Sequence, residues 1–282
     1  MTVPASEKYA HKVVPAGQWP ILGFSELWEG RRILFVLAQR LLKVRYQHTA
    51  LGIAWVVLQP LVLVLIVSVF MGFVIDRGVR DGLPFAVWLF PAWVAWRIFQ
   101  KVASEGGSAV GANGALVQRI YLPRIYFPTA VALASVIDLV FMMVAQLVLQ
   151  MAYGIVPGPG LLMLPVAVVI MYLAALGFSF FFSSSSLQYR DMDIVKPLVM
   201  QAWFWMSPII YPVSRLPEEI QPIYYLNPIA VVVEAFRWAF TRTPMPPPEA
   251  WVAGAFSATV FFVAGYVYFR RHEPLFADLM GE

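Results

Sequence analysis

An uncharged apolar stretch of 25 residues, Leu51 to Ile75, constrains this chain more than any other feature. At about 1.5 Å of rise per residue, a helix of this length exceeds the roughly 30 Å hydrocarbon core of a bilayer. The alternative is a helix buried inside a soluble protein. Composition argues against it, because only 13% of the residues are charged, about half the share expected in soluble domains. The sequence therefore predicts an all-α integral membrane protein.

The segment before this stretch, from Trp28 to Thr49, is basic and amphipathic. Its apolar residues, from Ile33 to Val44, recur every three to four positions, which is typical of a helix lying in the membrane interface. Its basic residues are Arg31, Arg32, Arg40, Lys43 and Arg45. Positive charge before the first span predicts that the N-terminus is cytoplasmic.

The remaining hydrophobic segments complete a six-span topology. We expect spans at about 51–75, 83–111, 127–151, 161–182, 194–211 and 250–269, between cytoplasmic tails at 1–27 and 270–282. Lys and Arg gather on the segments that this topology assigns to the cytoplasm. The connection 212–249 is then external. Its apolar run Ile229–Phe240 is too short to cross, so we expect a re-entrant or interfacial helix there.

Charged residues decide the extent of the second span. Ended at Trp96, the segment from Leu83 holds 14 residues and is too short to cross a membrane. Continued to Gly111, it contains Arg97, Lys101 and Glu105 at positions i, i+4 and i+8. We adopt the longer extent, in which the three charges share a helical face turned to a bundle interior or a water-filled path. The alternative is that Arg97 and Lys101 only reach back to the interface.

A lone carboxylate, Asp138, lies within the third predicted span. A carboxylate at this depth faces the bundle interior and has a partner. Asp138 is either protonated or paired with an arginine on a neighbouring helix, and its role is either structural or in gating.

Several kinds of chemistry are absent from the sequence. There is no cysteine and no Gly-Lys dipeptide, so thiolate sites and a phosphate-binding P-loop are excluded. The three histidines are scattered and lie outside the predicted spans, which argues against a metal site. We expect no cofactor, no catalytic residue and no nucleic-acid partner, and a transporter or channel subunit is the simplest interpretation.

Five segments, in order, resemble those of ABC polysaccharide-exporter permeases. They are KVRYQHTALGIAWVVLQPL, NGALVQRIYLPRIYFP, LQYRD, WFWMSPIIYPVSRLPEEIQPIYYLNPIAVVVEAFRWA and RRHEPLFAD. The resemblance covers about residues 25–280. It implies the membrane half of an ATP-driven exporter that moves a lipid-linked polysaccharide, such as an O-antigen, capsule or teichoic acid, across the bacterial cytoplasmic (inner) membrane. Arg97 departs from the family pattern, where a small polar or amide residue is expected.

The resemblance also implies partners. Two copies of the permease pair with two copies of a separate ATPase subunit, which binds ATP and Mg. The expected docking residues lie on two cytoplasmic loops: Gln118, Arg119, Tyr121, Pro123 and Arg124 on the first, and Arg190 and Asp191 on the second. Ordinary solvated loops are the alternative interpretation of both.

Three further sites follow from the implied substrate. Aromatic faces suit a sliding sugar chain, so we expect a channel lined by Trp93, Trp96, Arg97, Lys101, Trp203, Trp205 and Tyr211. The alternative for these aromatic residues is an interfacial belt or packed core. The basic residues of 28–49 either receive the lipid phosphate head or only anchor the helix to anionic lipids. The expected outer gate, in short external gate helices, comprises Tyr224, Tyr225, Asn227, Glu234 and Arg237; alternatively, its helix only caps the bundle.

The sequence leaves two alternative functions open. One is an exporter of a drug or small lipid, against which the aromatic content and the long external segment argue. The other is a membrane enzyme acting on a polyprenyl-linked sugar, which needs paired carboxylates. Asp191 and Asp193 are the one close pair with suitable exposure, so this function ranks lower.

Overall fold

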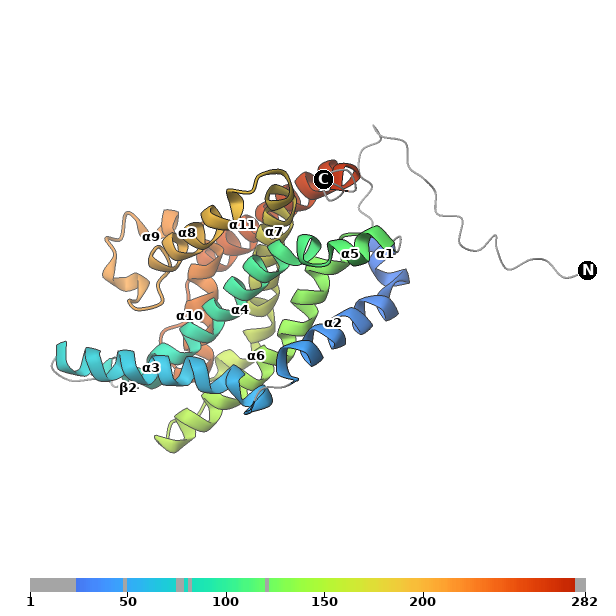
Figure 1. Cartoon of the computed structure of the whole chain (residues 1–282). Coiled ribbons are helices and arrows are strands. Elements are labelled where there is room, and N and C mark those ends of the chain that lie inside the picture. The colour runs from blue at the N-terminus through green and yellow to red at the C-terminus, as the bar shows by residue number, and fades with distance from the viewer. Residues whose placement is uncertain (1–23, 48–49, 75–78, 81–82, 120–121, 277–282) are drawn as a thin grey trace, which may run out of the picture.

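A computed structural model describes residues 24–47, 50–74, 79–80, 83–119 and 122–276 (Figure 1). The α-helices are α1 (Phe24–Glu29), α2 (Arg31–Tyr46), α3 (Trp55–Val74), α4 (Phe85–Ala112), α5 (Gly114–Arg119), α6 (Tyr126–Ala152), α7 (Leu164–Gln188), α8 (Met192–Trp205), α9 (Gln221–Tyr224), α10 (Pro228–Thr241) and α11 (Pro248–His272). Short 3₁₀ turns are η2 (Gly52–Ala54), η3 (Pro159–Leu162), η4 (Val213–Arg215) and η5 (Glu273–Leu275). Two-residue strands, β1 (Val79–Arg80) and β2 (Leu83–Pro84), pair antiparallel between α3 and α4.

The centre of the bundle is α7, which packs along α4 on one side and α11 on the other. Glycine makes both approaches close. A Cβ added at Gly107 of α4 would lie 2.6 Å from the Cβ of Phe182, and one at Gly265 of α11 would lie 2.0 Å from the carbonyl oxygen of Gly177. Backbones can approach in this way only where a side chain is missing. The three helices therefore form one tightly packed unit.

The helix α10 crosses this unit and contacts α4, α7 and α11. All of its 14 residues except Glu234 and Trp238 are buried. Asn227 caps its first turn by accepting from the Ile229 amide at 3.0 Å, and Arg242 ends it in the left-handed conformation. This capped and covered helix is the expected Ile229–Phe240 segment.

The expected interfacial helix 28–49 is broken at Gly30, where α1 ends and α2 begins. A Cβ on Gly30 would lie 1.9 Å from the Tyr126 hydroxyl, so the break lets the chain pass over α6. Leu34, Leu37 and Leu41 of α2 then pack on a hydrophobic cluster formed by the start of α6 and by the C-terminal parts of α7 and α11. His48 and Thr49 lie outside the described residues.

Four helices in the described part of the chain are long and apolar enough to cross a membrane: Gly52–Phe70, Tyr126–Ala152, Leu164–Gln188 and Pro248–Leu275. The other two predicted spans correspond to α4, which has 28 residues but carries charges, and to α8, which ends at Trp205 after 14 residues. The predicted tails also differ, because α1 begins at Phe24 and α11 continues to His272. A helix-rich membrane protein is confirmed, and the six-span count stays a prediction.

Candidate functional site

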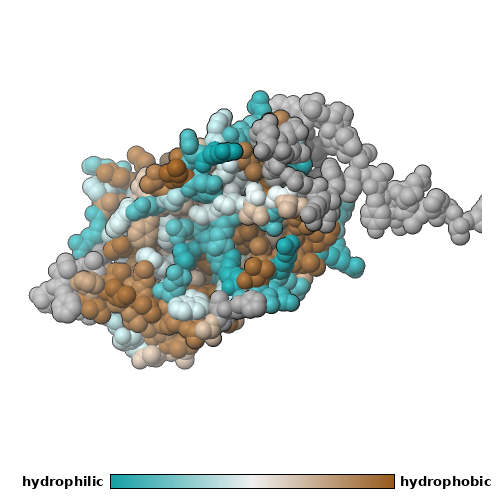
Figure 2. All heavy atoms as spheres, in the orientation of Figure 1, coloured by the Kyte–Doolittle hydropathy of each residue, from teal (hydrophilic) through white to brown (hydrophobic). Residues whose placement is uncertain are grey.

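One face of α4 carries polar side chains at helical spacing: Arg97, Gln100, Lys101, Ser104, Glu105 and Ser108. Side chains on the other faces, such as Ile98, Phe99 and Val102, are fully buried, whereas Glu105 and Ser108 are exposed. At about 1.5 Å per residue the face is about 16 Å long, roughly half the hydrocarbon thickness. Figure 2 shows hydrophilic surface over α4 beside hydrophobic surface over α3. In a membrane, such a face needs water or polar groups opposite it.

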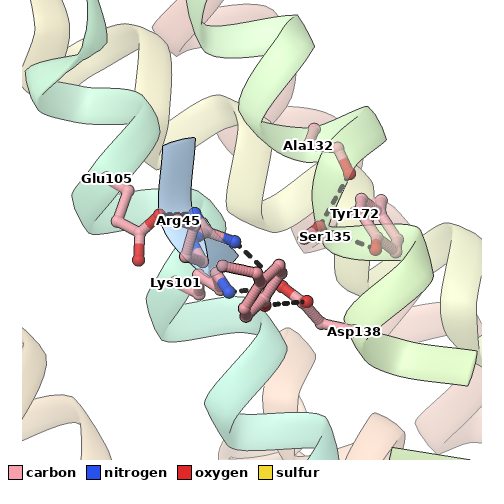
Figure 3. Close-up of polar contacts among 8 residues, drawn as sticks. Arg45, Lys101, Glu105, Ala132, Ser135, Asp138 and Tyr172 are labelled. Atoms are coloured by element: carbon pink, nitrogen blue, oxygen red, sulfur yellow. Dashed lines mark hydrogen bonds and ion pairs between the residues drawn. The ribbon is translucent and has the colours of Figure 1, made fainter. Parts of the chain in front are cut away.

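Beneath this face lies an ionic network centred on Asp138 of α6, which is fully buried (Figure 3). Arg45 of α2 donates to its Oδ2 at 3.1 Å, the Tyr46 hydroxyl donates to its Oδ1 at 2.7 Å, and Lys101 of α4 pairs with Oδ2. Arg45 also pairs with Glu105. Three helices that are distant in sequence therefore meet on one carboxylate. Of the two alternatives for Asp138, a protonated carboxyl or an arginine partner on a neighbouring helix, the structure shows the arginine.

The charges of this network balance, with two acids (Asp138 and Glu105) against two bases (Arg45 and Lys101). Burial, and then the hydrogen bond and negative charge of Asp138, raise the pKa of Tyr46, so its hydroxyl keeps its proton and remains a donor. Buried charges are tolerated when each is paired. All four charged groups are therefore paired with one another, so the network has little unpaired charge with which to bind a ligand.

Arg97 differs from its neighbours on the same face. Its guanidinium contacts the Gln100 side-chain oxygen at 3.4 Å. Within the described ranges, no carboxylate lies within 4 Å of it. Arg97 is therefore the cation of the α4 face that the acids of the Asp138 network do not balance.

The aromatic residues expected to line the channel differ in how exposed they are. Trp96 is buried and Trp93 half-buried; their rings lie 5.5 and 5.6 Å from that of Phe204 on α8. Trp203 is half-buried and donates from its indole nitrogen to Asn227 at 3.1 Å. Trp205 is 62% exposed. Phe204 therefore brings Trp93 and Trp96 of α4 together with α8, and this aromatic group adjoins the polar face at Arg97.

A second polar cluster surrounds α10. Glu234 accepts from the Tyr225 hydroxyl at 2.7 Å and from the Val213 amide at 3.2 Å. Burial raises the pKa of Glu234, while these two hydrogen bonds and the charge of Arg237 oppose that rise. Tyr211 and Tyr224 share a hydroxyl contact at 2.7 Å. The expected outer-gate residues are thus gathered in one place, which we call the α10 cluster.

Arg237 holds the α10 cluster to the preceding loop. Its guanidinium lies 3.6 Å from the ring centre of Trp88 and donates to the carbonyl oxygens of Ile209 and Tyr211. The side chain is 2% exposed. A buried cation that satisfies backbone carbonyls and stacks on an indole fixes the loop before α9 against α4 and α10.

The expected docking residues lie at the other end of the bundle. Residues 113–125, here called the elbow, join α4 to α6 and include α5; Pro123 and Arg124 are half-buried in it. Arg190 and Asp191 are exposed on the loop before α8. Nothing is described of Tyr121 or of the side chains of Gln118 and Arg119. Asp193, the other member of the exposed carboxylate pair, contacts Lys196 at 3.2 Å through one of its oxygens.

The basic residues of α2 do not act alike. Arg31, Arg32, Arg40 and Lys43 are exposed, whereas Arg45 turns inward to the Asp138 network. A groove of about 430 Å³ lies between α2, α4 and α6, and Arg40, Arg45, Glu105 and Asn113 contribute its polar lining. Four exposed cations thus remain on this helix for a membrane surface or a headgroup.

Sequence reasoning missed three residues that position these sites. Tyr46 completes the Asp138 network, Lys196 donates to Ser108 at 2.5 Å and so joins α8 to α4, and Glu273 accepts from the Arg124 amide at 3.1 Å. Tyr46 follows Arg45 directly, which is a weak signal. The other two pairs are separated by 88 and 149 residues, and no local pattern could have joined them.

Comparison with known proteins fits this architecture. The family model described as ABC-2 type transporter matches residues 32–241. The chain belongs to the ABC-2 type transporter family. The match runs from α2 to the end of α10, so it includes the polar face, the Asp138 network and the α10 cluster.

The chain is also similar to proteins named as O-antigen export permeases and as a polysialic acid transport protein. The chain is 28% identical over 256 residues to the O-antigen export system permease protein RfbA of Myxococcus xanthus, covering 88% of this chain and 95% of the relative. The RfbA permease of Klebsiella pneumoniae is 23% identical over the same shares of the two chains. The polysialic acid transport protein KpsM of Escherichia coli is 24% identical over 71% of this chain and 78% of the relative. The ABC-2 chain is thus a multi-pass transporter membrane subunit.

Proposed function

We propose that this chain is the permease subunit of an ATP-driven exporter that moves a lipid-linked polysaccharide across the bacterial cytoplasmic membrane. The observation that carries the proposal is the polar face of α4, part of which one copy of the chain leaves exposed; we place this face within the membrane as part of the proposed second span. Similarity to O-antigen and polysialic acid exporters supports a polysaccharide cargo. A second copy of the chain closes the face into a path, because lipid cannot solvate it.

The path combines polar and aromatic groups. Hydroxyls of a sugar need hydrogen-bonding partners, which Gln100, Ser104 and Ser108 supply along one line. The apolar C–H faces of sugars stack on rings, and Trp93 is the half-buried ring beside that line. Stacking holds a sugar without fixing every hydroxyl, which suits a long polymer that must slide.

Energy comes from a separate ATPase subunit in two copies, because this sequence has no P-loop. The ATPase docks on the elbow and on the loop with Arg190 and Asp191, at the cytoplasmic end, with both termini on that side. The exposed cations of α2 face the cytoplasmic leaflet, where they receive the phosphate head of the lipid-linked substrate. At the other end, α10 and its cluster form the outer gate as a re-entrant segment.

The test is reconstitution of the chain with its genomic ATPase neighbour. We expect the pair to co-purify, and we expect a lipid-linked glycan to stimulate its ATP hydrolysis. Arg124→Glu should lower co-purification without preventing membrane insertion, and Arg190→Glu on the exposed loop provides a second variant if the first inserts poorly. Arg215→Glu, exposed in the segment before α9, is the matched charge reversal and should co-purify normally. Glycosyl transfer without ATP would overturn the proposal in favour of an enzyme.

A further inference from the structure

The first inference concerns the charge of the cargo and rests on the proposed function. Lys101 is paired with Asp138, and Arg45 with Asp138 and Glu105, whereas Arg97 contacts an uncharged amide. The unbalanced cation lies in the polar face, one residue after Trp96. The proposed function places this face within the membrane, where a charge is tolerated only beside water or an opposite charge.

We infer that the polymer carried along α4 is acidic, with carboxylate or phosphate groups in its repeat, and that Arg97 contacts those groups. A guanidinium recognises such anions with two parallel hydrogen bonds. Each acidic repeat passing Arg97 supplies the counter-charge that the described residues do not. Because Arg45 and Lys101 are already paired with carboxylates, Arg97 alone attracts the polymer, and a single cation binds it too weakly to stop its movement.

The test uses two probes that share a backbone. Oligogalacturonate is acidic, and its methyl ester is neutral with the same sugar chain. We expect the reconstituted complex to bind the acid about tenfold more tightly than the ester, the size of one charge-assisted hydrogen bond. Arg97→Gln should bring the two affinities within about twofold of each other, while Arg97→Lys should keep most of the difference. Arg215→Gln removes one cation elsewhere and should change neither affinity.

Equal binding of the two probes to the wild type, binding of neither, or unchanged discrimination in Arg97→Gln would each overturn this inference. The proposed function has a separate readout, since ATPase co-purification does not depend on Arg97. A complex that co-purifies and responds to a lipid-linked neutral glycan, yet shows no preference for the acid, would preserve the exporter and remove the acidic cargo.

A second inference rests on a different observation, at the end of the chain. The amides of Tyr126 and Phe127, at the start of α6, bond to the carbonyls of Pro123 and Arg124 in the preceding turn, and the N-cap residue Ile125 has no side-chain cap that could bond the Arg124 amide. Instead, one carboxylate oxygen of Glu273, in η5, accepts from the Arg124 amide at 3.1 Å, and the other accepts from Arg270 at 2.8 Å. Phe276 is fully buried beside Phe269, with ring centres 5.3 Å apart.

The geometry points to Glu273 as a positioning residue that anchors the turn before α6 from the other end of the sequence. The carboxylate satisfies the Arg124 amide, which lies two residues before the first residue of α6, and it is close to the positive end of the helix dipole. The contact joins the elbow to the end of α11, so a push on the elbow moves α6 and α11 together. The part that concerns ATPase coupling rests on the proposed docking at the elbow.

Hydrogen exchange in the reconstituted complex shows whether Glu273 acts through the Arg124 amide or only through its ion pair with Arg270. Glu273→Ala should speed exchange of the amides at 124–127 by about tenfold, whereas Glu273→Gln, which keeps an acceptor oxygen, should change it by less than about threefold. The double variant Arg270→Glu with Glu273→Arg swaps the two charges and restores an ion pair, but it has no acceptor at position 273. Hydrogen exchange of the same amides should therefore stay fast. Arg271→Gln, exposed on the same turn, should behave as wild type.

Two results would contradict the role of Glu273 in holding the turn before α6. One is unchanged hydrogen exchange in Glu273→Ala, and the other is normal hydrogen exchange in the charge-swapped double variant. Glycan moved per ATP hydrolysed is the second readout, because a contact that is only structural changes yield and leaves this ratio unaltered. We expect the ratio to fall in Glu273→Ala while the ATPase still co-purifies. A normal ratio alongside faster exchange would remove the coupling role and leave the proposed exporter intact.

Discussion

The helices α3 and α10 are both strongly apolar, yet the fold treats them in opposite ways. In α3, only 17% of the most apolar window is buried, and residues such as Val62, Ile66 and Phe70 are exposed. In α10, every residue but Glu234 and Trp238 is buried among other helices. The more apolar of the two helices is therefore the less covered by protein (Figure 1).

The difference shows what hydropathy measures. It reports the preference of a segment for leaving water, and lipid and protein interior satisfy that preference equally well. The polar residues separate the two cases. In α3, Gln59 is exposed, whereas α10 buries Arg237 and half-buries Glu234, which require fixed partners. A short helix with satisfied buried charges is thus held by protein, and a long helix without charges is left to lipid or to a second copy.

The largest expected effect tests whether buried charges fix the bundle. Asp138→Ala leaves Arg45 and Lys101 without their shared carboxylate, and we expect a loss of about 3 kcal/mol, or roughly 6–12 °C in Tm. Thermal unfolding of the protein in detergent measures it. Ser135→Ala, one turn away on α6, loses a neutral contact with Tyr172 and should cost about 1 kcal/mol. A fully stable and active Asp138→Ala protein would contradict both a structural and a gating role.

Arg237→Met tests the same idea in α10. It removes the contact with Trp88 and two carbonyl partners while filling a similar volume, and we expect a loss of about 2–3 kcal/mol. The loop of Ile209 to Tyr211 should become accessible to protease in the reconstituted protein. Arg242→Met, exposed at the end of the same helix, is the control and should unfold as the wild type does. Equal protection of the loop in both variants would mean that packing alone holds α10.

The pH dependence of stability probes Glu234. Because its folded pKa is raised above the usual value of 4.5, the folded state binds the proton more tightly than the unfolded state. Its contribution is therefore present at low pH and is lost as the pH rises from about 4.5 through the folded pKa. We expect Tm to fall less over this window in Glu234→Gln than in the wild type. Glu218→Gln, exposed in the same segment, should keep the wild-type slope, and identical slopes for all three proteins would refute the role of Glu234.

The smallest effect is expected in α3 and sharpens the contrast with α10. Val62 is 44% exposed and Val64 is fully buried, so one helix supplies both the variant and its control. Val62→Ala should change stability by less than about 0.5 kcal/mol, and Val64→Ala should cost about 1–2 kcal/mol. Unfolding in detergent compares them directly. A larger cost at Val62 would show that protein, and not lipid, covers this side of α3.

Much of the helical content followed from local pattern, and the contacts between helices did not. The 25 uncharged residues from Leu51 predicted a helix, and the length needed to cross a membrane predicted that the helix from about Leu83 continues past Trp96. The break at Gly30 was missed, because it depends on the Tyr126 hydroxyl nearly one hundred residues later. The early end of α8 at Trp205 was missed as well, since the apolar run continues beyond it.

For the candidate site, the sequence marked out Asp138 and the need for a partner, because an isolated charge in hydrocarbon is too costly to stay unpaired. It could not choose Arg45 over the arginine at 97, since both lie near apolar segments. It also could not reveal that Glu273 reaches the Arg124 amide. Hydrogen bonds act over about 3 Å in space, whatever the separation along the chain.

The sequence by itself determined that this protein resides in a membrane and that it is helical, because hydropathy and its period along the chain are local properties. Only the tertiary structure decided that Arg45 and Lys101 pair with Asp138, whereas Arg97 has no carboxylate partner among the described residues. That outcome depends on distances between α2, α4 and α6, and a distance of this kind is fixed by packing and not by residue order (Figure 3).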